Sequence, residues 1–385
     1  MNILFIAYNF TPTQGGVQRV TDILTKEFLK RGHNVSFLCG CNKADGESYN
    51  TATDIYYMDK SLNDRLDYNS QMLYQSILRK LNIEVIIMQY PMRKRSLFFL
   101  ENASKNILRL SVIHTQPFPK VNGHFVFFNN NKIKNLIFSV IFLLRHYLQN
   151  HIQIKLYSEF TNLSDKVCLL SMEYKRRFLN FVDADENKVI AIGNPNTFEV
   201  TKYTTNKKNI ILFVGRLGYP KNAINFLNVW KLLSKKNRDW SAYIVGDGCD
   251  MGFLKEYAAK KRIERLHFEG QQSDVSKYYE EAKILCMTSL FEGWPMVLIE
   301  AMSYGCVPVC YSSFEALYDI VDDGKSGLLC KPFIVQDMVT KVQSLIEDKN
   351  KLDCQSMAAI QKVRVFHVSS IVDKWEAVFK EFNLE

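Results

Sequence analysis

The 385-residue sequence lacks several patterns that mark particular classes of protein. Its apolar runs are all shorter than a bilayer-spanning helix, which argues against an integral membrane protein. It has no CxxC pair and no Cys/His cluster, so a zinc site is not expected, and its nine cysteines fit reduced, mostly buried thiols of a cytosolic protein. The opening MNILFIAYNF lacks a basic leader, and its apolar run is too short for a signal peptide. We therefore expect a buried first strand there.

The length predicts two domains, and a composition of 47% hydrophobic and 23% charged residues is typical of a folded soluble protein. Strand-like runs alternate with helical segments, which indicates parallel sheets covered by helices on both faces. The polar segment GNPNTFEVTKYTTNKKN lacks periodicity and separates two groups of strands. We predict an α/β protein with one domain at 1–194 plus about 370–385 and a second at 195–369. The predicted strands are Ile3–Ala7, Val35–Cys39, Val85–Met88, Leu110–His114, Val167–Ser171, Val189–Ile192, Ile210–Val214, Ser241–Val245, Ile284–Thr288, Val307–Tyr311 and Gly327–Cys330.

The net charge of +9 is concentrated in the N-terminal half of the chain. Residues 1–190 carry 24 Lys/Arg and 16 Asp/Glu, whereas the rest carries 25 and 24. Residues 91–134 hold eight basic side chains and one acid, and 131–150 continue as NKIKNLIFSVIFLLRHYLQN. A basic, apolar helix of this kind can lie in a membrane interface, or it can be buried between domains or in a dimer. We find no nucleic-acid recognition motif.

Three glycine-containing motifs follow predicted strands, where ligands bind in doubly wound sheets. In FTPTQGGVQRV, Gly15 and Gly16 precede a helix whose free N–H groups could face an anion, although the segment could equally be an ordinary turn. In FVGRLGYPKNA, we expect Pro220 to begin a helix with Lys221 in its first turn. Arg216 and Lys221 could then clamp a diphosphate, or they could be two solvated surface cations. The segment IVGDGCDMG has GxGxxxG spacing and is better explained as a strand-to-helix turn.

The stretch SLFEGWPMVLIEAMSYGCVPV carries two carboxylates in unlike places. Glu292 lies in the loop ahead of a helix that we expect to begin at Pro295 and end at Gly305. Glu300 lies in a mostly apolar helix, about two turns in, where a buried carboxylate could accept hydrogen bonds from ribose hydroxyls. The alternative is a structural ion pair of Glu300 with a Lys or Arg elsewhere in the fold.

Together these motifs resemble the retaining GT-B glycosyltransferases of the family-4 type, also called glycosyl transferases group 1. The resemblance rests on Glu-x7-Glu followed by AMSYGCVPV, and on GGVQRV, SVIHTQ, LLSMEYKRRF, VIAIGNPN, FVGRLGYPKN and DIVDDGKSGLL in the family's order. It spans nearly the whole chain. It implies two Rossmann-like doubly wound domains that face each other across a cleft, with the C-terminal helix returning to the N-terminal domain. Trp294 and Pro295 replace the commoner aromatic-Gly pair, and 120–150 match nothing in the family.

The resemblance also implies roles for residues of the C-terminal half. Arg216 and Lys221 would stabilise the departing nucleoside diphosphate, and Glu300 would hold the ribose hydroxyls. Glu292 would hold hydroxyls of the donor sugar. Four residues would assist it with their backbone groups: Gly293, Trp294, Pro295 and Met296.

In the N-terminal half, Gly15 and Gly16 would let the first helix approach the donor phosphates. His114 would face the donor sugar and the acceptor, although a lone histidine at a strand end is more often structural. Cleavage of the C1–O bond puts negative charge on the diphosphate, and positioned cations and helix dipoles stabilise it without a metal. The family implies retention of the anomeric configuration and closure of the two domains over the donor.

We therefore predict a metal-independent retaining glycosyltransferase without a cofactor. It would move a hexose or N-acetylhexosamine, from a UDP-sugar before GDP-mannose, to a glycan or lipid-linked acceptor in bacterial surface polysaccharide or lipopolysaccharide assembly. We expect a cytoplasmic protein with peripheral membrane contact through 91–150. The alternatives are another GT-B enzyme, such as a nucleotide-sugar epimerase or a glycan phosphorylase, and a non-catalytic nucleotide-sugar-binding protein.

Overall fold

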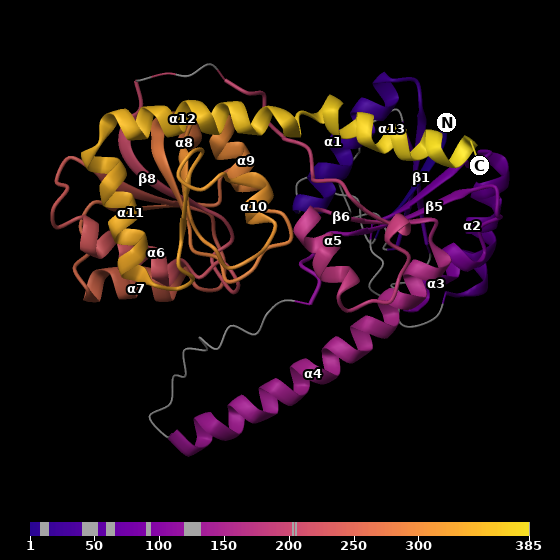
Figure 1. Cartoon of the computed structure of the whole chain (residues 1–385), viewed down its shortest axis with the longest axis horizontal. Helices are drawn as coiled ribbons and strands as arrows, with labels where there is room; N and C mark the ends of the chain where they lie inside the picture. Colours follow the sequence, from indigo (N-terminus) through magenta and orange to yellow (C-terminus); the bar gives the residue numbers. More distant parts are fainter. Residues whose placement is uncertain are drawn as a thin grey trace. The chain divides into compact units, whose positions relative to one another are not determined.

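A computed structural model describes residues 1–7, 15–40, 53–58, 66–89, 94–118, 132–201, 204 and 206–384 of the chain. The chain divides into two compact units (Figure 1). The first unit comprises Met1–Pro195 and Val368–Glu385, and the second comprises Asn196–His367.

The first unit is built on a sheet of seven strands, all of them parallel, in the order β3-β2-β1-β4-β5-β6-β7. Because β1 lies between β2 and β4, Ile3 is in register with Val35 on one side and Val85 on the other. The strands are β1 Asn2–Ala7, β2 Asn34–Cys39, β3 Asp54–Tyr57, β4 Val85–Met88, β5 Leu108–Ile113, β6 Lys166–Leu169 and β7 Val189–Ala191. The helices are α1 Gly16–Lys30, α2 Tyr68–Lys80, α3 Lys94–Glu101, α4 Lys132–Leu163, α5 Met172–Leu179 and α13 Val368–Leu384, with a 3-10 turn at Glu186–Lys188.

Helices cover both faces of this sheet because successive side chains of a strand point to opposite faces. On one face, Leu4 and Ile6 of β1 join a core with α2, α3 and the end of α4. On the other face, the ring of Phe5 lies 6.4 Å from Phe28 of α1, which in turn lies 5.8 Å from Phe379 of α13. The sheet is therefore buried on both sides, as the near-continuous apolar strands predicted.

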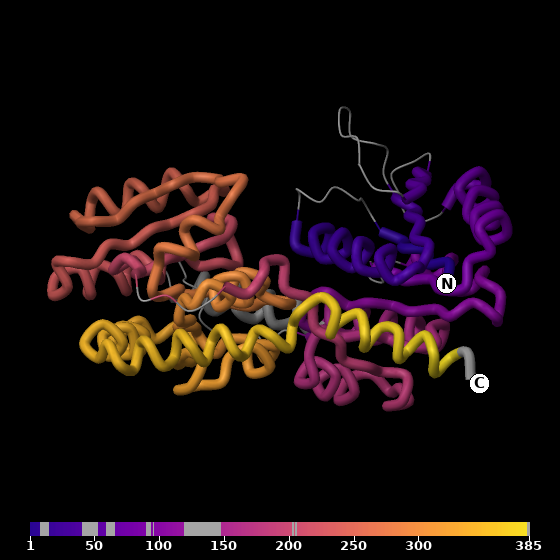
Figure 2. Tube along the Cα trace, turned by 90° about the horizontal axis from the view of Figure 1, so that it is seen from above, coloured from indigo at the N-terminus to yellow at the C-terminus, as the bar shows by residue number. Residues whose placement is uncertain are grey.

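The C-terminal helix α13 packs against α1 of the first unit (Figures 1 and 2). Arg31, at the end of α1, donates hydrogen bonds to Asp373 at 2.7 Å, to Glu376 at 3.1 Å and to the carbonyl of Ser369 at 2.9 Å. His33 bonds to the other oxygen of Glu376 at 3.0 Å. The predicted return of the C-terminal helix to the N-terminal part of the chain is confirmed.

The second unit has a six-stranded parallel sheet in the order β10-β9-β8-β11-β12-β13. Its strands are β8 Lys208–Val214, β9 Ser241–Val245, β10 Leu266–Gly270, β11 Ala282–Met287, β12 Val307–Tyr311 and β13 Leu328–Cys330. Its helices are α6 Ala223–Leu233, α7 Met251–Lys260, α8 Ser276–Glu281, α9 Met296–Ser303, α10 Leu317–Ile320, α11 Val335–Glu347 and α12 Lys349–Val363, followed by a 3-10 turn at Arg364–Phe366. The predicted α/β class with two parallel sheets is confirmed.

Two strands, β3 and β10, were not predicted from the sequence. Each lies at an edge of its sheet, as do β7 and β13, which were predicted. An edge strand has one neighbour, and where it is also partly exposed its sequence carries a weaker apolar signal. In β3 all four residues retain some exposure, and β10 includes the exposed His267. The eleven predicted strands all occur, three with the predicted bounds and the others with ends shifted by one or two residues.

Candidate functional site

Three glycines bring two loops into close contact at the carboxyl-terminal edge of the second sheet. The N–H of Gly215, after β8, donates to the Val245 carbonyl at 3.0 Å, and Leu217 N–H donates to Asp247 at 2.8 Å. A Cβ on Gly246 would lie 2.0 Å from the Gly215 carbonyl oxygen, and one on Gly248 would lie 2.1 Å from that of Leu217. The segment IVGDGCDMG is therefore a strand-to-helix turn whose glycines permit close approach of the β8 loop.

The loop after β8 and the loop after β11 place opposite charges in contact. Lys221 Nζ lies 2.6 Å from Glu292 Oε1, and the two side chains are only 20% and 13% exposed. The hydroxyl of Ser289 donates to the same Glu292 oxygen at 2.7 Å. The stem of Lys221 lies over Gly215, since a Cβ there would be 3.3 Å from Lys221 Cε. The pair holds both side chains in fixed positions at the sheet edge.

The expectation that Pro220 begins a helix is wrong. Residues 218–221 form a turn closed by the Lys221 N–H and the Gly218 carbonyl at 2.8 Å, and α6 begins only at Ala223. Asn222, with a φ of 54°, separates the turn from the helix. The hydroxyl of Thr288 donates to the carbonyls of Lys221 and Asn222 at 3.2 and 3.0 Å. Because Thr288, just after β11, donates to these carbonyls, Lys221 precedes α6 and does not lie in its first turn.

Arg216 directly follows Gly215 at the end of β8 and is exposed. It makes no ion pair with any residue that the structure describes. At this sheet edge the second unit therefore has an exposed guanidinium, that of Arg216, and an ion-paired ammonium, that of Lys221. Such groups can bind phosphate oxygens.

Helix α9 begins at Met296 and has Pro295 as its N-cap, without a side-chain hydrogen bond to the cap. Trp294 is 8% exposed and packs edge-on against Phe366, with ring centroids 5.5 Å apart. Its buried Nε1 has no hydrogen-bond acceptor among the described residues. The loop of Gly293 thus ends at the positive end of a helix, beside an indole held by packing.

Glu300 is 1% exposed within α9. One carboxylate oxygen accepts a hydrogen bond from Thr197 Oγ1 at 2.9 Å, and the other accepts one from the Tyr279 hydroxyl at 3.0 Å. Glu300 is the fifth residue of a helix that begins at Met296, so it lies just over one turn into the helix rather than two. Sequence reasoning missed Thr197, which lies in a segment that resembles a linker, and Tyr279, whose burial no local pattern marks.

Gly15 and Gly16 lie at the N-terminus of α1 in the first unit. Gly15 is the N-cap, and the first turn of α1 has no acidic residue. A Cβ on Gly15 would lie 2.7 Å from Gln18 Oε1, whereas one on Gly16 would meet nothing within 4 Å. The N-terminal N–H groups of α1 therefore have no acidic side chain of their own turn beside them. Residues 10–14 of this motif lie outside the described residues.

His114 follows β5 and bonds through Nε2 to the side-chain oxygen of Gln89, which follows β4 and is 4% exposed. Burial lowers the pKa of His114 to about 4, so the imidazole is neutral near pH 7. With the proton on Nε2, Nδ1 is an acceptor; this buried nitrogen has no partner among the described residues. Gln89 was not predicted, because its contact with His114 arises only from the pairing of β4 with β5.

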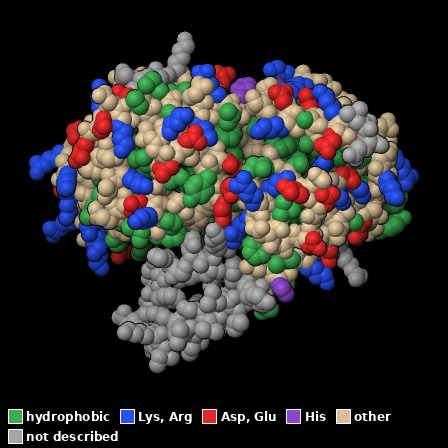
Figure 3. Space-filling model, viewed as in Figure 1, with side chains coloured by type: hydrophobic (Ala, Val, Ile, Leu, Met, Phe, Trp, Pro, Cys, Tyr) green, Lys and Arg blue, Asp and Glu red, His purple; other side chains and the backbone are tan. Residues whose placement is uncertain are grey.

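The basic side chains predicted within 91–134 have different surroundings in the structure. Arg109 is paired with Asp165 at 2.7 Å, whereas Lys94 and Lys105 are exposed. Arg93 and Lys120 lie outside the described residues, as do the side chains of Arg95 and of 132–147. The helix predicted within 131–150 is the first part of α4 (Figure 1). On the face drawn in Figure 3, Lys and Arg side chains are interspersed with Asp and Glu side chains.

Within the described part of the chain, no helix is long and apolar enough to cross a membrane. The same residues contain no cluster of three or more His, Cys, Asp or Glu side chains that could hold a metal ion.

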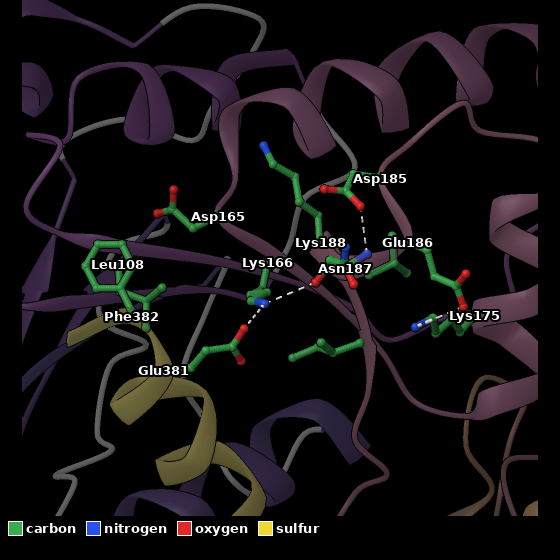
Figure 4. Close-up of a pocket in the computed structure, with 12 residues that line it drawn as sticks. Leu108, Asp165, Lys166, Lys175, Asp185, Glu186, Asn187, Lys188, Glu381 and Phe382 are labelled. Carbon is green, nitrogen blue, oxygen red and sulfur yellow. Dashed lines mark hydrogen bonds and ion pairs between the residues drawn. The ribbon is translucent and has the colours of Figure 1, made fainter. Parts of the chain in front are cut away.

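A hollow of about 740 Å³ opens at the amino-terminal edge of the first sheet, the edge at which its strands begin (Figure 4). It lies where β5, β6 and β7 begin, at Leu108, Lys166 and Val189. Four of its charged side chains form ion pairs, Lys166 with Glu381 at 2.6 Å and Lys175 with Glu186 at 3.7 Å. Because ligands of doubly wound sheets bind at the carboxyl ends of the strands, we do not assign the donor to this hollow.

Comparisons with known proteins identify similar glycosyltransferases. Residues 196–362 match the family Glycosyl transferases group 1. An uncharacterized glycosyltransferase of Haemophilus influenzae is 27% identical over 368 residues, 94% of this chain and 96% of that protein. The Campylobacter jejuni enzyme GalNAc-alpha-(1->4)-GalNAc-alpha-(1->3)-diNAcBac-PP-undecaprenol alpha-1,4-N-acetyl-D-galactosaminyltransferase is 31% identical over 178 residues, 46% of this chain and 49% of that protein.

Among solved structures, a mutant of S. aureus TarM in complex with Fondaparinux, alpha-GlcNAc-glycerol and UDP superposes with a TM-score of 0.76. The match covers 98% of this chain and 99% of that chain, at 15% identity. The shared architecture is the GT-B fold, with two parallel sheets and a C-terminal helix on the first unit. The chain is a glycosyltransferase, and its residues 196–362 match the group 1 family.

Proposed function

We propose that the chain is a metal-independent, retaining glycosyltransferase that uses a nucleotide sugar as donor. The observation that carries this proposal is the placement of Arg216, Lys221 and Glu292 together at the carboxyl-terminal edge of the second sheet. Breaking the bond between sugar C1 and the diphosphate oxygen develops negative charge on the diphosphate. An exposed guanidinium and a positioned ammonium would stabilise that charge.

The two carboxylates would hold different parts of the donor. Glu292, oriented by Lys221 and Ser289, would accept hydrogen bonds from hydroxyls of the donor sugar. Glu300 would hold the ribose hydroxyls. Between them, the first turn of α9 and the loop of Gly293 to Met296 would direct backbone groups at the phosphates and the sugar, with an N–H group from each residue of the loop except Pro295.

Residues of the first unit would act on the same donor. The N-terminus of α1, at Gly15 and Gly16, would approach the phosphates. His114 would contact the donor sugar as a neutral imidazole, because its depressed pKa excludes a cation near pH 7. Nδ1 would then accept a hydrogen bond from a sugar hydroxyl.

We propose a UDP-linked hexose or N-acetylhexosamine as donor. The S. aureus TarM variant was solved with UDP, and the name of the Campylobacter relative describes transfer of N-acetylgalactosamine. The acceptor that this name describes is a glycan on undecaprenyl diphosphate. We therefore propose a glycan or lipid-linked acceptor in bacterial surface polysaccharide or lipopolysaccharide assembly, with peripheral contact to the cytoplasmic membrane through 91–150.

The test is release of nucleoside diphosphate from a panel of sugar nucleotides, with and without a lipid-linked acceptor and in the presence of EDTA. Turnover should be lost in Lys221→Ala and Glu292→Ala. Two exposed residues of the same unit, Lys236 and Glu256, provide matched controls, since Lys236→Ala and Glu256→Ala should retain turnover. Turnover that survives both site changes would refute the site assignment.

The same assay separates the alternatives. A nucleotide-sugar epimerase would convert the donor without releasing nucleoside diphosphate, and a non-catalytic protein would bind the donor without any turnover. Retention is tested by NMR of the product, in which the new linkage should have the anomeric configuration of the donor. Vesicle flotation with anionic lipid tests the membrane contact, and failure of the protein to float with the vesicles would refute it.

A further inference from the structure

The buried carboxylate of Glu300 is held by two hydroxyl groups from outside its helix. Thr197 lies just after the chain enters the second unit, and Tyr279 lies in α8. Each hydroxyl donates to a different oxygen, at 2.9 Å and 3.0 Å. Two such bonds fix the rotation of the carboxylate about its terminal torsion, which is otherwise broad.

We propose that Thr197, together with Tyr279, is a positioning residue that orients Glu300 toward the ribose of the donor. The inference rests on the proposed function, in which Glu300 holds the ribose hydroxyls. Thr197 itself would not touch the donor. Loss of its hydroxyl should therefore weaken the binding only of ligands that Glu300 contacts.

The position of Thr197 is fixed by its neighbours in sequence. Asn196 N–H donates to the Phe366 carbonyl at 2.7 Å, and Asn196 Nδ2 donates to Ser303 Oγ at 2.7 Å. Thr201 Oγ1 donates to the carbonyl of Ser303 at 2.9 Å. The segment 196–201 therefore lies along α9 and is attached to it both before and after Thr197.

Aromatic packing adds to this attachment. The ring of Phe198 lies 6.2 Å from Tyr279 and 5.7 Å from Tyr304, which follows α9. The backbone between Asn196 and Phe198 is thus held on both sides of Thr197. A hydroxyl on so constrained a residue can orient a carboxylate at little further cost in conformational entropy.

The anchors of Thr197 are also the points where the chain passes between the two units. Asn196 is the first residue of the second unit, and Phe366 lies one residue before its last, His367. Trp294, at the start of α9, packs on Phe366. Helix α9, which carries Glu300, is therefore attached to both connections within the second unit. A ribose bound at Glu300 would therefore contact α9, the helix that is attached to both connections.

The test compares nucleoside diphosphates with and without ribose hydroxyls. Dissociation constants of UDP and of 2′,3′-dideoxy-UDP are measured by calorimetry for the wild type, Thr197→Val and Thr197→Ser. A valine has nearly the shape of threonine but lacks the hydroxyl, so it should weaken UDP binding about tenfold. It should leave binding of the dideoxy compound within about twofold, and Thr197→Ser should restore UDP binding. Tyr279→Phe should show the same selectivity.

Equal weakening of both ligands by Thr197→Val would indicate a merely structural role and overturn the inference. Unchanged UDP binding in Thr197→Val and Tyr279→Phe would also overturn it, and would leave the proposed function standing. If the wild type does not bind UDP, the proposed UDP-sugar donor fails and the inference fails with it. If the wild type binds UDP and dideoxy-UDP equally well, only the ribose role of Glu300 and this inference fail.

Discussion

Acidification should destabilise the first unit through the imidazole of His114. The pKa of this group is lowered by burial to about 4, from an ordinary value of 6.5. The unfolded chain therefore takes up a proton as the pH falls through 6.5, whereas the folded protein does not until about pH 4. The stability contributed by the neutral imidazole is therefore present above about pH 6.5 and is lost as the pH falls toward 4.

The size of the effect follows from the same two values. At pH 5 the unfolded imidazole is almost fully protonated and the folded one is largely neutral, which corresponds to a loss of about 2 kcal/mol relative to pH 8. Other groups also titrate in this range, so His114→Gln, which is neutral at both pH values, is the reference. The wild type should lose about 2 kcal/mol more than this variant between pH 8 and pH 5.

Urea unfolding followed by circular dichroism at both pH values measures this difference. Faster hydrogen exchange at pH 5 in the paired strands β4 and β5, which directly precede Gln89 and His114, would assign the loss of stability to the first unit. Equal losses in wild type and variant would mean that the folded imidazole takes up the proton as readily as the unfolded one. That result would refute both the burial argument and the neutral form proposed for contact with the donor sugar.

Three further predictions test other parts of the structure. Gly246→Ala should lower the free energy of unfolding, measured in urea titrations, by about 3 kcal/mol or more. Its Cβ would lie 2.0 Å from a carbonyl oxygen, and the residue has a φ of 135°. Gly252→Ala is the control: its Cβ would meet nothing within 4 Å, so the same titrations should show no loss of stability. Arg31→Ala should cost about 1–2 kcal/mol and raise hydrogen exchange in α13; unchanged exchange there would contradict the role of Arg31 in holding that helix. Lys221→Ala should lower kcat about 100-fold in steady-state assays, while a change in donor KM alone would contradict stabilisation of the leaving diphosphate.

Much of the fold followed from local patterns. Interior strands of a parallel sheet are buried on both faces, so their sequences are short apolar runs that are visible without a structure. The edge strands β3 and β10 were missed because they are only partly covered and carry polar residues. The start of α6 was misplaced because carbonyls of residues 221 and 222 bond to Thr288 of a distant segment, which no local helix signal reveals.

The candidate site divides in the same way. Arg216, Lys221, Glu292 and Glu300 were recognised because each lies shortly after a strand, in a loop or in the helix that follows, and because their spacing resembles a known family. The tertiary structure alone decided what each side chain contacts: Lys221 bonds to Glu292, and Glu300 accepts hydrogen bonds from the hydroxyls of Thr197 and Tyr279. These partners are separated by 21 to 103 residues along the chain. Periodicity and turn chemistry act over a few residues, whereas sheet pairing and helix packing bring such distant groups within hydrogen-bonding distance.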